Sequence, residues 1–225
     1  MENIKFELYK DHEWTTLIQD SIQEARNKQT SIPQHCLDIW GMSGMKYRML
    51  INNLMRKLPN PRYLEIGTYT GSTLCAAIGG VPGMKALAVD NFSLGGSSID
   101  QCRANVDKVK AENSDIEIRN QSFEEFDFSA NGKFNVYMYD AEHDEKDQKA
   151  AITRCHPALD EYAVIIVDDW NDHGYTTPVK VGTYAGFAES KLEILFKWEV
   201  ETGMNGPIGS DWHNGYAIFL VKNCS

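Results

Sequence analysis

The stretch Tyr63-Leu64-Glu65-Ile66-Gly67-Thr68-Tyr69-Thr70-Gly71-Ser72 decides the fold. It begins as an apolar strand, continues through a turn with two glycines four residues apart, and leads into a helix. Glycines in such a turn let the backbone bend sharply and bring main-chain N–H groups close to a ligand, because no Cβ stands in the way. The same pattern also occurs as plain turn chemistry, so the flanking sequence has to decide between the two.

Downstream of this turn, apolar strands alternate with amphipathic helices. We expect strands at 63–66, 85–89, 116–120, 134–139, 163–167, 192–200 and 216–222, and helices at 72–78, 98–112 and 145–159. Continuous apolar strands separated by helices are typical of a parallel sheet covered on both faces. The last two strands have no helix between them, which predicts an antiparallel hairpin at one edge. The sequence therefore predicts a doubly wound α/β fold with a mostly parallel seven-stranded sheet and an antiparallel C-terminal hairpin.

Upstream of the turn, apolar residues recur at helical spacing in two segments, 13–28 and 46–58. Residues 1–58 are predicted to form a helical cover, and residues 59–225 the core of the same domain. Repeats, low-complexity segments and linkers are absent from the sequence, which favours a single domain overall.

Composition restricts the class of partner. The chain has 225 residues, 42% of them apolar, and a formal net charge of −10. Nucleic acids and anionic membranes bind positively charged surfaces, so we expect a small-molecule partner, with no nucleic acid and no membrane. The five cysteines are scattered and include no Cys-x-x-Cys pair, which favours reduced thiols. The N-terminus lacks a signal-peptide pattern, so a cytoplasmic location is expected.

The end of the second core strand supports a nucleotide-like ligand. Asp90 lies 25 residues after Glu65, where a carboxylate can accept hydrogen bonds from both hydroxyls of a ribose. A dinucleotide site prefers Gly-x-Gly-x-x-Gly facing a pyrophosphate, whereas this turn has Tyr69 at its centre and an acid before the first glycine. A carboxylate would repel a pyrophosphate but favour a cationic amino-acid tail. S-adenosyl-L-methionine (SAM) is therefore predicted rather than NAD.

A second polar cluster follows two later strands. Asp140 comes directly after the strand at 134–139, and Asp168 and Asp169 come after the strand at 163–167. If these strands are neighbours, three carboxylates converge, and a divalent cation such as Mg²⁺ would relieve their repulsion. The alternative is that Asp168 and Asp169 cap a helix or pair with lysines. His143 follows Asp140 by one helical turn and could accept a proton from a substrate hydroxyl.

These motifs together resemble the class I SAM-dependent methyltransferases, whose fold is Rossmann-like. Within them, they are most similar to the metal-dependent small-molecule O-methyltransferases of the catechol and macrocin types. The glycine turn is similar in spacing to the catechol enzymes' cofactor loop, including its central tyrosine. The resemblance implies cofactor contacts at Met42, Gly44, Glu65, Gly67, Thr68, Tyr69, Gly71, Ser72, Asp90, Asn91, Gln121, Ser122 and Asp140.

The resemblance also implies magnesium ligation by Asp140, Asp168 and Asp169, the Asp-Asp pair being closer to the macrocin type than to the Asp-Asn of catechol enzymes. The chain departs from the catechol pattern at the general base, where His143 stands in place of a lysine.

The predicted function is a Mg²⁺-dependent transfer of a methyl group from SAM to a small hydroxylated substrate, with His143 and Asp140 as catalytic residues. Trp40, Trp170 and Trp212 could stack on an aromatic or sugar ring of that substrate. The alternatives are a metal-independent methyltransferase, an adenosyl-cofactor-binding protein without catalysis, and a dehydrogenase. A homodimer is a common outcome for such domains.

Overall fold

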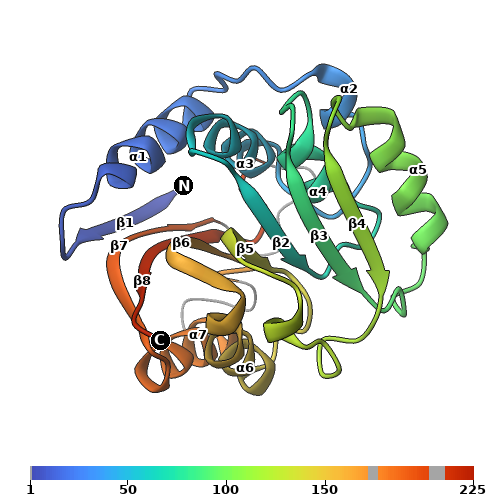
Figure 1. The fold of residues 1–225 in the computed structure, drawn as a ribbon. Helices are drawn as coiled ribbons and strands as arrows, with labels where there is room; N and C mark the ends of the chain where they lie inside the picture. The colour runs from blue at the N-terminus through green and yellow to red at the C-terminus, as the bar shows by residue number, and fades with distance from the viewer. Residues whose placement is uncertain (1, 172–176, 203–210) are drawn as a thin grey trace. The chain divides into compact units, whose positions relative to one another are not determined.

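The computed structural model describes residues 2–171, 177–202 and 211–225 (Figure 1). The strands are β1 (Asn3–Leu8), β2 (Arg62–Ile66), β3 (Lys85–Asp90), β4 (Asp115–Asn120), β5 (Phe134–Tyr139), β6 (Leu159–Asp168), β7 (Leu192–Glu201) and β8 (Tyr216–Asn223). The helices are α1 (Glu13–Arg26), α2 (Gln34–Leu37), α3 (Met45–Lys57), α4 (Ser72–Ile78), α5 (Ile99–Val109), α6 (Glu145–Cys155) and α7 (Pro178–Glu189), with 3₁₀ turns η1 (Phe128–Ala130) and η2 (His156–Ala158).

The described residues form two compact units. The N-terminal unit comprises residues 13–126 together with 211 and 212, and the C-terminal unit comprises the remainder, including β1. The predicted single domain, with a helical cover at residues 1–58 and a core at residues 59–225, stays a prediction.

The N-terminal unit is built on three parallel strands in the order β2-β3-β4. Leu64 and Ile66 of β2 lie next to the turn and are buried. Both belong to a short apolar run, as expected for a strand of a covered parallel sheet. Helix α3 packs against α1 and α4. The Asn52 side chain fixes α3 to α4 by donating to the carbonyls of Ala76 and Gly79, both at 2.8 Å. This packing holds the helix that follows the glycine turn.

The C-terminal unit has the strand order β1-β7-β8-β6-β5. Strands β5 and β6 are parallel and are connected through α6, whereas β8 runs antiparallel to both β6 and β7. Every residue of β5 is buried, as its mostly apolar sequence predicts, and Asn135 is the polar residue among them. The C-terminal strand therefore lies between β6 and β7, and β1 extends the sheet beyond β7 in antiparallel pairing.

Helix α7, which the sequence analysis did not predict, lies beside α6 (Figure 1). Its two glycines lower the helix propensity, but both stand where α6 approaches closely. A Cβ on Gly186 would lie 2.6 Å from Ile152 Cβ, and one on Gly182 would overlap the Glu145 carbonyl oxygen. Tertiary packing thus requires the residues that make this helix hard to recognise in the sequence.

The α/β class, the parallel strands and the antiparallel C-terminal hairpin are confirmed. The predicted count of seven strands is wrong, because the described residues form eight. The missed strand is β1, whose residues alternate between apolar and charged over only six positions. The hairpin is also not at the edge of its sheet, since β1 pairs with the outer side of β7.

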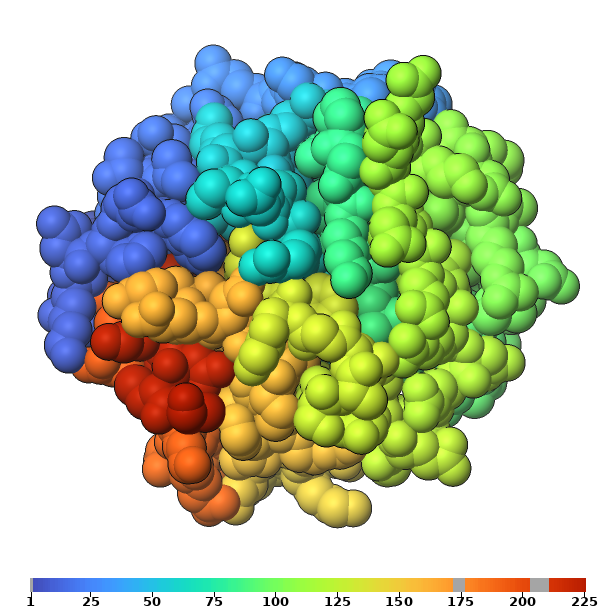
Figure 2. Space-filling view, viewed as in Figure 1, coloured from blue at the N-terminus to red at the C-terminus, as the bar shows by residue number. Residues whose placement is uncertain are grey.

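Strand β1 is exposed on the surface of the protein, where Figure 2 shows the N-terminal residues in dark blue. Among the described residues, no helix combines the length and the apolar character needed to cross a membrane.

Candidate active site

The glycine turn links the end of β2 to the start of α4. Gly67, Tyr69 and Gly71 have positive φ angles of 87°, 51° and 85°. The turn is closed by a hydrogen bond from the Gly71 N–H to the Thr68 carbonyl oxygen at 2.7 Å. A Cβ on Gly71 would lie 2.9 Å from Cys102 Sγ on α5. Both its backbone angle and its neighbour therefore require glycine at this position.

Asp90 closes the turn from the end of the neighbouring strand. Its Oδ2 accepts hydrogen bonds from the backbone N–H groups of Thr68 and Tyr69, each at 2.7 Å. Its Oδ1 accepts from the Phe92 N–H at 2.5 Å. These bonds fix the predicted ribose-binding acid and the glycine turn to each other. The carboxyl group is partly exposed, so ligands can still reach this end of β3.

Glu65 lies beneath the turn, fully buried. Its two carboxyl oxygens accept hydrogen bonds from the hydroxyls of Tyr63 at 2.5 Å and Thr73 at 3.0 Å. Burial raises the pKa of the Glu65 carboxyl to about 7, and the two hydroxyls oppose that shift only in part. Glu65 therefore supports the turn from inside the protein, with protein hydroxyls on both of its oxygens.

The segment 38–44, which precedes α3, is attached to the turn. The Thr70 hydroxyl donates to the Trp40 carbonyl oxygen at 2.5 Å, and the hydroxyls of Ser43 and Ser72 are 2.9 Å apart. Gly41 packs so closely against Ser72 that a Cβ there would overlap the serine side chain. The segment that contains the predicted cofactor contacts Met42 and Gly44 is thus held against the turn.

Arg48 on α3 is a residue that the sequence analysis missed. Its guanidinium group is buried and donates to the carbonyl oxygens of Leu37 (3.1 Å), Ile39 (2.8 Å) and Ser43 (3.2 Å). Burial lowers its pKa from the usual arginine value. The only signal in the sequence is a basic residue on the apolar face of an amphipathic helix. Arg48 satisfies the carbonyls of a segment that has no regular structure of its own.

Two large side chains of this region are exposed, Trp40 at 56% and Met42 at 39%. The Trp40 ring lies against Tyr69, with 5.7 Å between the ring centroids. This pair forms an apolar surface at the mouth of the turn. Large exposed apolar side chains next to a strained turn are typical of a ligand-binding surface.

The predicted cofactor contacts Asn91, Gln121 and Ser122 lie beside the end of β3. The Gln121 N–H donates to the Asp90 carbonyl oxygen at 3.0 Å, and its side chain donates to the Glu125 carbonyl oxygen at 3.1 Å. Ser122 is half-buried and Asn91 is exposed. Apart from Asp140, all predicted cofactor contacts lie in the N-terminal unit.

The predicted catalytic and metal-binding residues lie in the C-terminal unit. Asp140 and Asp168 occupy neighbouring positions at the carboxyl ends of the paired strands β5 and β6. Asp169, which has a φ of +50°, directs its Oδ2 to His143 Nε2 at 3.1 Å. Among the described residues, no group of three or more His, Cys, Asp and Glu side chains has the geometry to hold a metal ion. These residues as arranged therefore do not fit the predicted three-carboxylate magnesium site.

The tryptophans differ from expectation. Trp170 and Trp212 are buried, at 0% and 1% exposure, so only Trp40 is available to stack on a ligand as the protein stands. Trp170 donates from Nε1 to Glu199 Oε2 at 3.1 Å and packs at an edge against Tyr184. Their size and apolar character place them in the core. His173, which the sequence places in the loop after Trp170 and which is a further candidate for substrate contact, lies outside the described residues.

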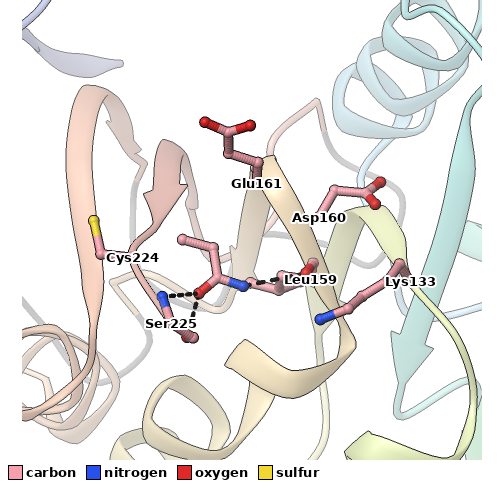
Figure 3. A pocket seen from close by; sticks show the side chains of 7 residues that line it. Lys133, Leu159, Asp160, Glu161, Cys224 and Ser225 are labelled. Atoms are coloured by element: carbon pink, nitrogen blue, oxygen red, sulfur yellow. Dashed lines mark hydrogen bonds between the residues drawn. The ribbon is translucent and has the colours of Figure 1, made fainter.

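A hollow of about 480 Å³ lies in the C-terminal unit (Figure 3). It is lined by Lys133, Leu159, Asp160, Glu161, Asn223, Cys224 and Ser225. These residues stand at the amino ends of β5 and β6, opposite to Asp140 and Asp168. Ligands of parallel sheets bind beyond the carboxyl ends of the strands, so this hollow is not the candidate active site.

Comparison with known proteins connects this geometry to a family. Residues 64–170 match the model of a methyltransferase domain. This match spans slightly less than half of the chain and marks a likeness to methyltransferase domains over that part. No curated protein sequence matches it.

Solved structures agree with this fold. An O-methyltransferase from Bacillus cereus in complex with SAH is 17% identical, with 92% of this chain and 91% of that chain covered and a TM-score of 0.53. The O-methyltransferase TomG from Streptomyces achromogenes, in complex with SAM, is 15% identical over 95% and 91%, with a TM-score of 0.54. Cofactor-bound Rv0187 from MTB is 16% identical over 93% and 90%, with a TM-score of 0.55. At these identities the likeness concerns the fold.

Glu65 gives the stability of this chain a testable pH dependence. Its folded-state pKa of about 7 lies above the ordinary value of 4.5, so the folded state holds this proton more tightly than the unfolded state. The Glu65 contribution to stability is therefore fully present below pH 4.5 and is lost as the pH rises through 7. Relative to Glu65→Gln, the wild type should lose about 3 kcal/mol of unfolding free energy over this window.

Urea unfolding at several pH values measures this difference. The informative quantity is the change of the unfolding free energy with pH, not the constant difference between the two proteins. Glu112→Gln, at an exposed position in the same unit, is the matched control and should follow the wild type. Parallel curves for the wild type and Glu65→Gln would show that the buried carboxyl has no raised pKa.

Proposed function

We propose that this protein transfers a methyl group from SAM to a hydroxyl oxygen of a small molecule. The observation that carries the proposal is the glycine turn, held by the Asp90 carboxylate at the carboxyl end of the β2–β3 pair. The methyltransferase-domain match over residues 64–170 supports the reaction class. The O-methyltransferases among the similar structures support oxygen as the acceptor.

The residues of the N-terminal unit suit an adenosyl ligand. The partly exposed Asp90 can accept ribose hydroxyls, and the open backbone at Gly67 lets a ligand approach the turn closely. The exposed side chains of Trp40 and Met42 offer an apolar surface beside it. Bound SAM would supply an electrophilic methyl group on a positively charged sulfur.

His143 is the proposed general base. Its Nε2 lies 3.1 Å from Asp169 Oδ2, which favours the tautomer with the proton on Nε2 and a lone pair on Nδ1. Within the described residues, Nδ1 is shielded from solvent and has no hydrogen-bond partner. We propose that this nitrogen accepts the proton of the substrate hydroxyl once substrate binding opens access to it, while Asp169 orients the ring and stabilises the resulting imidazolium.

The predicted magnesium ion is a separate proposal, and the described acids do not form a three-ligand site for it. Asp140 and Asp168 are adjacent at the strand ends, whereas Asp169 is engaged with His143. We therefore assign no step of the reaction to a metal. The geometry favours the version in which His143 alone removes the proton.

Binding of the cofactor is the first test. Isothermal titration calorimetry should show SAM and SAH binding to the wild type, and no binding of NADH. Asp90→Asn keeps one acceptor oxygen for the N–H groups of Thr68 and Tyr69 but loses the acceptor for the Phe92 N–H and removes the charge. It should weaken binding by roughly tenfold to a hundredfold, the loss expected for a charged hydrogen bond.

Asp100→Asn is the matched control, because Asp100 lies on α5 of the same unit with its side chain 92% exposed. It should bind SAM as the wild type does. Preference for NADH would favour a dehydrogenase, and unchanged SAM binding by Asp90→Asn would contradict the assigned site.

Transfer to oxygen is tested with a panel of phenols, catechols and sugars and methyl-labelled SAM. His143→Ala should bind SAM normally but lower turnover by about 10²- to 10⁴-fold, the usual contribution of a general base. Asp144→Asn, at the exposed N-cap of α6, is the neighbouring control for structural disturbance.

Chelation by EDTA should leave turnover unchanged if His143 acts without a metal. Loss of turnover on chelation, restored by Mg²⁺, would instead support the magnesium-dependent reaction. SAM binding without labelled product from any acceptor of the panel would favour a binding protein without catalysis.

A further inference from the structure

Strand β1 lies at one end of the strand order, with β7 on its inner side. Among the described strands, none pairs with its outer edge. Phe6 is 65% exposed and Leu8 is 52% exposed, and both lie on the same face of the strand as Ile4. An exposed edge with a row of apolar side chains readily pairs with another strand.

The backbone of β1 is oriented for such pairing. The Tyr9 N–H donates to the Leu195 carbonyl oxygen at 2.8 Å, so the odd-numbered residues of this segment direct their N–H and C=O groups to β7. In the register of the β1–β7 pair, the N–H and C=O groups of Ile4, Phe6 and Leu8 then point outward. Three residues in alternation thus present unpaired backbone groups along the outer edge.

The side chains of β1 are complementary to a second copy of the same strand. In an antiparallel pair centred on Phe6, Phe6 lies opposite Phe6, Ile4 opposite Leu8, and Lys5 opposite Glu7. The first two are the hydrogen-bonded pairs that the outward groups require. Lys5 and Glu7 are 58% and 52% exposed beside their partners on β7, which leaves both side chains able to reach a second chain.

The neighbouring registers are disfavoured. Shifting the centre to residue 5 places Lys5 opposite Lys5, and shifting it to residue 7 places Glu7 opposite Glu7. Like charges directly opposite each other destabilise a strand pair. Registers centred between two residues would place apolar side chains opposite charged ones and misalign the outward backbone groups.

We propose that two copies of this chain associate through antiparallel pairing of their β1 strands, centred on Phe6. The contact is isologous, as two-fold symmetry requires, and it joins the sheets of the two C-terminal units. One six-residue strand pair buries less surface than a standard protein interface, so the dimer should dissociate on dilution.

The test uses opposite charge changes in the full chain. Sedimentation equilibrium of the wild type over a concentration series should show a reversible monomer–dimer equilibrium. Lys5→Glu and Glu7→Lys should each weaken self-association by roughly tenfold or more, because each places like charges opposite each other twice in the dimer. An equimolar mixture of the two variants should associate again, since every acidic position then faces a basic one.

Both substitutions also change ion pairs with β7, so near-ultraviolet circular dichroism must first show that each variant is folded. Phe6→Pro is the independent variant, because it removes an outward N–H and no bond to β7, and it should abolish the dimer. A wild type that stays monomeric, variants that dimerise as the wild type does, or a mixture that does not associate would each overturn the proposal.

Discussion

The hydrogen bonds between the Asp90 carboxylate and the backbone of the glycine turn are the constraint on which the candidate site depends. They join the ends of two adjacent parallel strands, so the turn cannot move independently of β3. The positive φ angle of Tyr69 is costly in isolation, and the hydrogen bond from its N–H to the fixed carboxylate helps to hold it. In the proposed function, the same acid that holds the turn would also bind the ribose of the cofactor.

Buried polar groups support this arrangement from two sides. Glu65 receives hydrogen bonds from Tyr63 and Thr73 beneath the turn. Arg48 binds two carbonyl oxygens of the segment 38–44 and one at the end of α2. Such groups are costly to bury and are stable only when their hydrogen bonds are made. The buried side chains of Glu65 and Arg48 thus stabilise a surface made of irregular backbone. Such an arrangement is typical of a binding site rather than of a plain turn.

Long-range patterns made the core of the fold predictable from sequence. Buried parallel strands such as β5 are mostly apolar in sequence. The two glycines of the turn are four residues apart, and Asp90 follows Glu65 by 25 residues. The missed elements depend on tertiary contacts. Helix α7 contains two glycines that only its packing on α6 explains, and β1 is a short alternation stabilised by pairing with β7.

The sequence predicted which residue types lie at the candidate site better than it predicted the directions of their side chains. The acids at 140 and 168 do follow neighbouring strands, but the backbone at Asp169 turns its carboxylate to His143, which the sequence does not reveal. Glu65 was expected to favour a cationic ligand, yet burial raises its pKa and protein hydroxyls bind both of its oxygens. Arg48 was not predicted, because it lies in an amphipathic helix and belongs to no recognised motif.

The most direct test is a crystal structure grown with SAH. The account predicts adenosyl density along the turn from Gly67 to Gly71, with the ribose hydroxyls within hydrogen-bond distance of the Asp90 carboxylate and the adenine beside Ser122. Density for SAH at another place on the chain, or a bound SAH whose ribose makes no contact with Asp90, would contradict it.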